Sequence, residues 1–385
     1  MRLLESFFEV DFPFLLTQLL GMAALGKLLG QRPLLSPMPL RIKRMLSSLP
    51  NTDEDDSVSV TSAPPFGHLS TDHLALKDAS RSLFMSKFNP LLKRMDDEDW
   101  FPHDAWLTLV KHGYLGLTIP QKYGGVGLDF LAAGLVAEEL HYANSSLGIS
   151  HSAHDNLCAN NIYLNGTEEQ RMRFLPGLCD GSFIGALGMS EAGAGSDAIG
   201  SMATRAVQDP SDGSFVLNGS KLWITNGPIA DVVLVYAKTV TATGAGTGDG
   251  RASRNAGVSA LLVEKGMEGF SVGKKMDQKM GFRGSPQSEL VFEDVRVPAQ
   301  NVLGRAGEGV GVMMSGLDLE RSWVAAGSIG IAERALDLSV DWARQRTQFD
   351  QPIGNFQLIQ DKLARMYSSL SSAQLLTRKA LAVRQ

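Results

Sequence analysis

The chain has 385 residues, with 36 lysines and arginines against 41 aspartates and glutamates, so its formal net charge is −5 at pH 7. This balance argues against a protein that binds nucleic acid through phosphate contacts, because such proteins need a surplus of basic surface. At roughly 150 residues per domain the length predicts two to three domains, and the 44% of hydrophobic residues can fill their cores.

The N-terminal region predicts a targeting segment rather than a membrane anchor. Residues 12–26 are uncharged, but they are shorter than the roughly twenty residues that a spanning helix needs. Residues 12–52 contain no acid, several basic residues and neighbouring serines, as mitochondrial transit peptides do, although a disordered basic tail is an alternative. Met38 is an alternative start. We expect residues 1–67 to be a transit peptide-like segment and linker, and the protein to reside in the mitochondrial matrix.

Residues 68–180 show a helical pattern. Ser70 or Thr71 can cap a first helix, and residues 131–142 form a dense apolar run that predicts another. Pro120 interrupts the pattern between them. We expect an α-helical domain.

The period changes in residues 181–298, which predict a β domain. Residues 214–225 alternate apolar and polar side chains around Asn218-Gly219, which predicts a hairpin. Further strands are expected at 232–239, 258–265 and 288–297. A long polar loop rich in Gly and Thr is expected at 239–255. Residues 299–385 return to a helical pattern.

The two cysteines, Cys158 and Cys179, form no Cys-x-x-Cys pair and no Cys/His cluster at metal-ligand spacing. We therefore expect no disulfide scaffold and no metal site. All seven histidines precede residue 155, so a Ser-His-Asp triad in the rest of the chain would need a distant histidine.

One loop in the β domain, LGMSEAGAGSDAIG, is rich in small residues. Gly193, Ala194 and Gly195 remove side-chain bulk, so a flat or phosphorylated ligand could approach the backbone closely, and Ser190 and Ser196 add hydroxyls. The loop lacks the Gly-x-Gly-x-x-Gly spacing of a nicotinamide-binding fold. An ordinary tight turn is the alternative.

A carboxylate lies in an apolar stripe of the helix expected after Gly309. At 100° per residue the stripe contains Met313, Leu317, Glu320, Val324 and Ile331, while Asp318 points to the opposite side. Desolvation would raise the pKa of Glu320 and suit it to take a proton from a weakly acidic carbon. A buried ion pair with Arg321 or another cation explains the pattern equally well.

Five segments in register resemble the acyl-CoA dehydrogenase family, from about residue 70 to Gln385. They are HDNLCANNIYLNGTEEQRMRFLP (154–176), GMSEAGAGSDAIG (188–200), KLWITNG (221–227), GLDLER (316–321) and RTQFDQPIGNFQLIQDKLARMY (346–367). The resemblance implies an α+β fold with an N-terminal helical domain (68–180), a central β-barrel-like domain (181–298) and a C-terminal helical bundle (299–385).

The resemblance also implies roles for particular residues. Glu320 would be the catalytic base. The loop residues that would cover one side of the flavin of FAD are Leu187, Gly188, Met189, Ser190, Gly193, Ala194, Gly195 and Ser196. Trp223, Ile224 and Thr225 would pack against and hydrogen-bond the isoalloxazine, and Arg346 and Gln357 match positions that reach the FAD of a neighbouring subunit. The substrate-side positions are Ser196, Ser253, Arg254, Asp318, Leu319 and Arg321.

Three departures from the family pattern stand out. Ala192 replaces a more usual Pro or Asn, and Asp350 replaces a common Gly, where Asp tolerates left-handed backbone. The chain stops at Gln385, where the family continues through further helices with a Gly-Gly cofactor motif and a Glu-Gly-Thr loop. We therefore expect a C-terminally shortened chain in which the family's homotetramer is impaired.

The activity implied is FAD-dependent α,β-dehydrogenation of a short branched-chain acyl-CoA, from isovaleryl-CoA to 3-methylcrotonyl-CoA in leucine degradation, with electron-transfer flavoprotein as acceptor. The alternatives are another acyl chain length, a flavin oxidase of the same fold, or a non-catalytic shortened isoform. We expect neither nucleic acid nor a membrane span.

Overall fold

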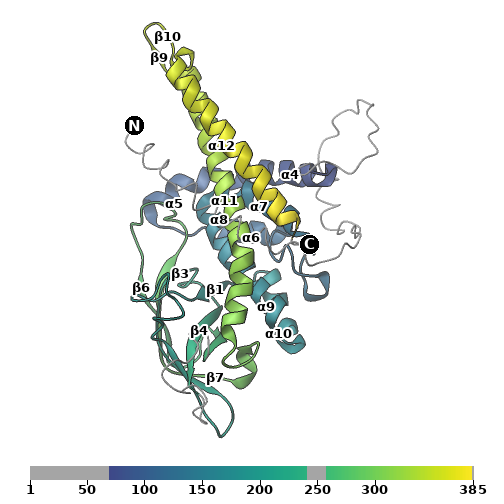
Figure 1. The fold of residues 1–385 in the computed structure, drawn as a ribbon, viewed down its shortest axis with the longest axis vertical. Helices are drawn as coiled ribbons and strands as arrows, with labels where there is room; N and C mark the ends of the chain where they lie inside the picture. Colours follow the sequence, from purple (N-terminus) through teal and green to yellow (C-terminus); the bar gives the residue numbers. More distant parts are fainter. Residues whose placement is uncertain (1–68, 241–256, 384–385) are drawn as a thin grey trace.

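The computed structural model describes residues 69–240 and 257–383 (Figure 1). The expected targeting segment and most of the expected loop at 239–255 lie outside the described residues. Ser253 and Arg254 belong to that loop, so their expected contact with CoA also lies outside them.

The N-terminal region is helical, as expected. Its helices are α4 (Thr71–Lys87), α5 (Leu92–Glu98), α6 (His103–His112), α7 (Phe130–Ala143), α8 (Ser145–Ser152), a π-helix (Ala153–Asn160), α9 (Asn161–Asn165) and α10 (Glu168–Cys179). Short 3-10 turns lie at Asn89–Leu91 and Gln121–Tyr123. The hydroxyl of Ser70 accepts a hydrogen bond from the backbone N–H of His73 at 3.2 Å, which confirms Ser70 as the first N-cap. Almost every residue of α7 is buried, so this helix is the centre of the domain.

The middle region is one eight-stranded sheet. Its strands are β1 (Gly185–Gly188), β2 (Arg205–Gln208), β3 (Phe215–Thr225), β4 (Val232–Val240), β5 (Val258–Glu264), β6 (Phe270–Lys275), β7 (Gln287–Val297) and β8 (Val302–Leu303). The order is β6-β7-β3-β2-β4-β5-β8, with β1 paired in parallel to β4. A 3-10 turn, Ala299–Asn301, precedes β8. The expected strands at 232–239, 258–265 and 288–297 are confirmed as β4, β5 and β7.

The hairpin expected at Asn218-Gly219 is wrong, because β3 runs straight through it. The pairing of β3 with β7 shifts register between Leu217 and Gly219, which marks a β-bulge. Gly219 has φ of 137°, and a Cβ there would lie 2.8 Å from the Cα of Thr204. The glycine therefore serves a bulge and a close backbone approach within one strand, and the Asn-Gly pair makes no turn.

The C-terminal region is a two-helix arm. Helix α11 (Gly309–Gln345) starts beside the sheet, passes α7 and continues beyond the body of the molecule (Figure 1). A small hairpin of β9 (Thr347–Gln348) and β10 (Gln351–Pro352) and a 3-10 turn (Ile353–Asn355) lead into α12 (Gln357–Ala382), which returns along α11. Asp350 has φ of 59° in the hairpin, so it takes the left-handed conformation expected of it. In the described residues, no helix is long and apolar enough to cross a membrane.

The apolar stripe expected on α11 is partly wrong. Val324 is 43% exposed, and Leu317 and Ile331 are only half-buried. The buried face instead uses small residues: a Cβ on Gly330 would lie 2.0 Å from the carbonyl oxygen of Glu138 on α7. Close backbone packing sets this face, and a count of large apolar residues does not detect it.

Candidate active site

Glu320 on α11 meets Asn156 of the π-helix. Nδ2 of Asn156 donates a hydrogen bond to Oε2 of Glu320 at 2.5 Å, although the two residues lie 164 positions apart in sequence. In a π-helix the hydrogen bonds run from residue i to i+5, which adds a residue to the turn and redirects the side chains that follow. Such segments are frequent at functional sites.

The carboxyl group of Glu320 lies in a desolvated position without a cation. Burial raises its pKa to about 8, and the hydrogen bond from Asn156 opposes that rise. The residue as a whole is half-buried, so part of it remains accessible while the carboxyl group is shielded. Arg321 pairs with Asp318 instead, at 2.6 Å, and Glu320 has no ion pair within residues 69–240 and 257–383. Of the two explanations open from the sequence, the structure favours the isolated carboxyl group over the buried ion pair.

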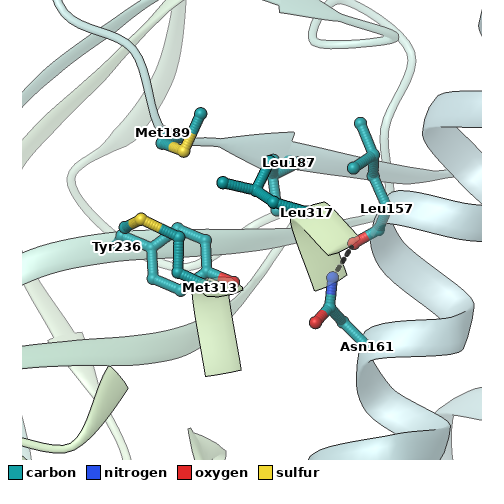
Figure 2. A pocket seen from close by; sticks show the side chains of 7 residues that line it. All are labelled: Leu157, Asn161, Leu187, Met189, Tyr236, Met313 and Leu317. Atoms are coloured by element: carbon teal, nitrogen blue, oxygen red, sulfur yellow. Dashed lines mark hydrogen bonds between the residues drawn. The ribbon is translucent and has the colours of Figure 1, made fainter. Parts of the chain in front are cut away.

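A small apolar pocket lies where the segment around Leu157, the loop after β1 and α11 meet (Figure 2). Its lining residues are Leu157 and Asn161, Leu187 and Met189, Tyr236 of β4, and Met313 and Leu317 of α11. Leu157 follows Asn156, and Leu317 precedes Glu320 by one turn. The structure thus brings the expected cofactor loop and the helix that carries Glu320 to a common pocket.

The loop after β1 is fastened to the strand that carries Trp223. The backbone N–H of Leu222 donates to the carbonyl oxygen of Ser190 at 2.9 Å. Nζ of the buried Lys221 lies 2.7 Å from Oε1 of Glu191. The two segments expected on one ligand, 187–196 and 223–225, therefore lie together.

The surface of this loop is open where a ligand would need room. Gly193 and Gly195 have no atom within 4 Å of the place where a Cβ would be. Ser196 is exposed and Ser190 half-buried, while Ala194 is buried and pairs with Glu191 in a tight turn. Gly188 is buried in the sheet.

Trp223 is the conspicuous residue of the second segment. It lies at a register shift of β3, has φ of 60°, and leaves 52% of its side chain exposed. A non-glycine residue with positive φ is uncommon and strained, and such residues cluster at ligand sites. Ile224, by contrast, is buried in the β core, so only its backbone can meet a ligand. The hydroxyl of Thr225 accepts a hydrogen bond from Gln287 at 3.1 Å.

The remaining expected residues do not line the pocket. Arg346 ends α11 and Gln357 begins α12, so both lie at the far tip of the arm, away from the pocket (Figure 1). Asp318 and Arg321 form a partly exposed pair on α11, and Leu319 is buried. Within one chain the structure does not bring Arg346 or Gln357 to Glu320.

Sequence reasoning missed the contact of Asn156 with Glu320 and the position of Tyr236 in the pocket. The signal for the first was present, because HDNLCANN places four Asp or Asn residues in a helical run, and polar side chains inside a helix domain need partners. Tyr236 carried no separate signal within its apolar strand.

Comparison with known families agrees with this architecture. Residues 70–182 match the acyl-CoA dehydrogenase N-terminal domain, 186–295 its middle domain and 307–385 its C-terminal domain. The fold and site define a flavin-dependent oxidoreductase. The chain belongs to the acyl-CoA dehydrogenase family, whose members use FAD.

Two relatives have nearly the same identity. A mitochondrial isovaleryl-CoA dehydrogenase of Solanum tuberosum is 43% identical over 319 residues, which are 81% of this chain and 74% of the relative. A mitochondrial 2-methylacyl-CoA dehydrogenase of the same plant is 43% identical over 300 residues, 77% of this chain and 69% of the relative. The solved butyryl-CoA dehydrogenase of Megasphaera elsdenii is 38% identical and has a TM-score of 0.76. The match covers 83% of this chain and 80% of the butyryl-CoA dehydrogenase chain.

Proposed function

We propose that this chain catalyses the α,β-dehydrogenation of a short branched-chain acyl-CoA, with isovaleryl-CoA as substrate and 3-methylcrotonyl-CoA as product. The observation that carries the proposal is the carboxyl group of Glu320, which is desolvated and unpaired with any cation of the described chain, on the helix α11 that lines one pocket together with the expected cofactor loop. A carboxylate in such a position is a stronger base than one in water.

The residues present fit FAD as the cofactor. The exposed indole of Trp223 offers a flat face, and the open space above Gly193 and Gly195 leaves room for a planar ligand against the backbone. Ser190 and Ser196 add hydroxyl groups at the same loop. When bound, FAD would supply the acceptor for the hydride that leaves the β-carbon.

Glu320 would carry out the proton transfer. Its Oε2 is engaged by Asn156, and no described residue donates to Oε1, so Oε1 would accept the proton from the carbon next to the thioester carbonyl. Burial shields the carboxylate from water and so strengthens it as a base. Asp318, Leu319 and Arg321 would flank the substrate on the same helix.

A second substrate class is favoured by a specific comparison. The 2-methylacyl-CoA dehydrogenase is as similar to this chain as the isovaleryl enzyme is. Both substrates are branched, but the branch lies at the β-carbon in isovaleryl-CoA and at the α-carbon in a 2-methylacyl-CoA. The α-branch replaces one of the two α-hydrogens, so it lies beside the base.

The experiment is a panel of acyl-CoAs, assayed with an artificial electron acceptor. The proposal expects the largest kcat/KM for isovaleryl-CoA, with 2-methylbutyryl-CoA and isobutyryl-CoA as the α-branched comparison and butyryl-CoA and palmitoyl-CoA as the straight-chain comparison. A preference for palmitoyl-CoA would contradict it. Oxygen consumption in the absence of the acceptor would indicate an oxidase.

The partners and location proposed follow from the family. Electron-transfer flavoprotein would reoxidise the cofactor, and Arg346 and Gln357 at the tip of the arm would reach the FAD of a neighbouring subunit. The mitochondrial matrix is proposed as the location, since the two plant relatives named above are mitochondrial. Sedimentation would show whether a tetramer forms, and import into isolated mitochondria would test the location.

A further inference from the structure

We infer that Asn156 is a positioning residue for Glu320, and that a one-way chain of hydrogen bonds from Thr118 through Asn160 holds it in that role. The inference rests on the proposed function, because it assigns Asn156 its role relative to the base proposed there. It concerns residues that the sequence motifs left without a function.

The chain of hydrogen bonds has a direction. Oγ1 of Thr118 donates to Oδ1 of Asn160 at 2.8 Å, and Nδ2 of Asn160 donates to Oδ1 of Asn156 at 3.2 Å. Nδ2 of Asn156 then donates to Oε2 of Glu320 at 2.5 Å. Every donor points toward the carboxylate, so each amide can turn only one way without breaking two bonds. Successive hydrogen bonds of this kind polarise and strengthen one another.

The amides of the chain are shielded from water. Asn156 and Asn160 are each only 1% exposed, whereas Thr118 at the far end is half-buried. A buried amide that loses its hydrogen-bond partners destabilises the folded protein. The amides of Asn156 and Asn160 are therefore held in place by their bonds to each other and to Glu320. A solvent-exposed asparagine would have no such constraint.

The two residues that precede Asn156 fasten the π-helix to the rest of the protein. The carboxylate of Asp155 accepts from the backbone N–H groups of Gly116 at 2.5 Å and Leu117 at 3.1 Å. The backbone N–H of Gly185, in β1, donates to Nδ1 of His154 at 2.9 Å. The π-helix therefore cannot rotate to move Asn156 away from α11 without breaking these bonds.

The distance between α11 and the start of α9, which directly follows the π-helix, is set one turn before Glu320. A Cβ on Gly316 would lie 2.3 Å from Nδ2 of Asn161, so the two segments approach as closely as a glycine permits. Gly316 precedes Glu320 by four residues, and Asn161 follows Asn156 by five. The glycine thus brings the carboxylate within reach of the amide.

The consequence for the base is both geometric and electrostatic. The amide fixes Oε2 and leaves Oε1 for the proton that comes from the α-carbon. A donor also favours the charged form of the carboxylate, which partly offsets the loss of hydration. Without it, the same desolvated group would hold its proton to a higher pH.

The test compares Asn156→Ala with Asn165→Ala. Asn165 also donates to α11, from Nδ2 to Oγ of Ser315 at 3.2 Å, but it does not contact Glu320, so it is a matched control. Thr118→Val, which keeps the shape of the side chain, removes the start of the chain and serves if Asn156→Ala does not fold. Each variant is measured from pH 6 to pH 10 in two ways.

The first measurement is flavin bleaching in a single turnover with saturating isovaleryl-CoA. The second needs neither flavin nor substrate: it is the infrared band of the protonated carboxyl group, assigned by subtracting the spectrum of Glu320→Gln. Loss of a donor to a charged group shifts a pKa by about one unit or more. We expect Asn156→Ala to raise the infrared midpoint by about one pH unit and to slow bleaching about tenfold at pH 7, with the gap narrowing as pH rises.

We expect Thr118→Val to raise the infrared midpoint and to slow flavin bleaching, each by less than Asn156→Ala does. Asn165→Ala should match the parent protein in both measurements. An unchanged infrared midpoint and pH profile in a folded Asn156→Ala would overturn the inference. If isovaleryl-CoA fails to bleach the parent flavin, the proposed substrate is wrong, and the infrared titration still decides the role of Asn156. If Glu320→Gln bleaches at the parent rate, the base itself is wrong and the inference fails with it.

Discussion

Nζ of Lys221 lies 2.7 Å from Oε1 of Glu191, with both side chains buried where β3 meets the loop after β1. The same carboxylate accepts hydrogen bonds from the backbone N–H groups of Ala203 at 2.6 Å and Thr204 at 3.1 Å. One buried ion pair therefore closes the loop that contains Ser190 and the two open glycines. The proposed cofactor surface depends on this closure.

Replacing Lys221 should damage both stability and cofactor binding. Lys221→Met fills similar space but leaves the Glu191 carboxylate buried without its cation, which commonly costs about 3–5 kcal/mol. We expect a lower midpoint in urea and a protein purified with less FAD. Lys265→Met is the control, because Lys265 pairs with Asp231 at the exposed surface. Equal midpoints for the two variants would show that the buried pair does not hold the loop.

The packing of α11 on α7 predicts opposite outcomes for two glycines of one helix. At Gly330 a Cβ would lie 2.0 Å from a backbone oxygen of α7, whereas at Gly311 nothing lies within 4 Å. We expect Gly330→Ala to destabilise the protein by about 1–3 kcal/mol or more through overpacking. Gly311→Ala should stabilise it by up to about 1 kcal/mol, because alanine is the better helix former. Thermal unfolding of both variants is the measurement, and a stable Gly330→Ala would contradict the close approach.

Trp223 should matter to the cofactor more than to the fold. Its positive φ is strained for tryptophan and relaxed for glycine, and about half of its side chain is exposed. We expect Trp223→Gly to keep the thermal midpoint of the flavin-free protein and to weaken FAD binding at least tenfold, measured by titration of the flavin-free protein. Trp100→Ala, which removes a tryptophan stacked under Arg94, is the control for FAD affinity. Parent-like affinity in Trp223→Gly would remove this residue from the site.

Acid should destabilise the protein through a buried histidine. Burial lowers the pKa of His154 to about 4, from an ordinary value of 6.5. Between these values the unfolded chain binds more protons than the folded protein, so the free energy of unfolding should fall as pH drops from 6.5 to 4. Urea titrations across this range should show the slope, and it should be smaller in His154→Gln. The exposed His103, changed to Gln, is the control. The same slope in all three proteins would argue against a neutral buried His154.

The elements that the sequence predicts best are those whose burial follows one simple period. The strands at 232–239 and 258–265 contain the apolar runs 232–237 and 260–263 because β4 and β5 lie inside the sheet and are buried there. The hairpin at Asn218-Gly219 was wrong because a glycine with positive φ serves a bulge as well as a turn, and local sequence does not distinguish the two. Only the pairing of β3 with β7, which is distant in sequence, distinguishes a bulge from a turn here.

The sequence predicts individual residues of the candidate site, but it does not predict which of them are in contact. Placing Glu320 near the apolar side of α11 was correct, although Val324 in the same stripe is exposed. Its contact with Asn156 depends on how closely two helices approach at Gly316, which is set by tertiary packing. The resemblance to a family pointed to the loop at 187–196 and to Trp223 as the cofactor surface, but it gave no partner for Glu320, the proposed base.

The central claim is that Glu320 is the base, and the rate of flavin bleaching in Glu320→Gln tests it most directly. The amide keeps the shape of the side chain, so the variant should still bind FAD and acyl-CoA and keep the parent's thermal midpoint. Bleaching should slow by about 10²–10⁴-fold, since loss of a general base has that effect and the described residues offer Glu320 no substitute in the same contact. Glu308→Gln, an exposed change just before the same helix, should bleach at the parent rate. A folded, FAD-loaded Glu320→Gln that also bleaches at the parent rate would contradict the account.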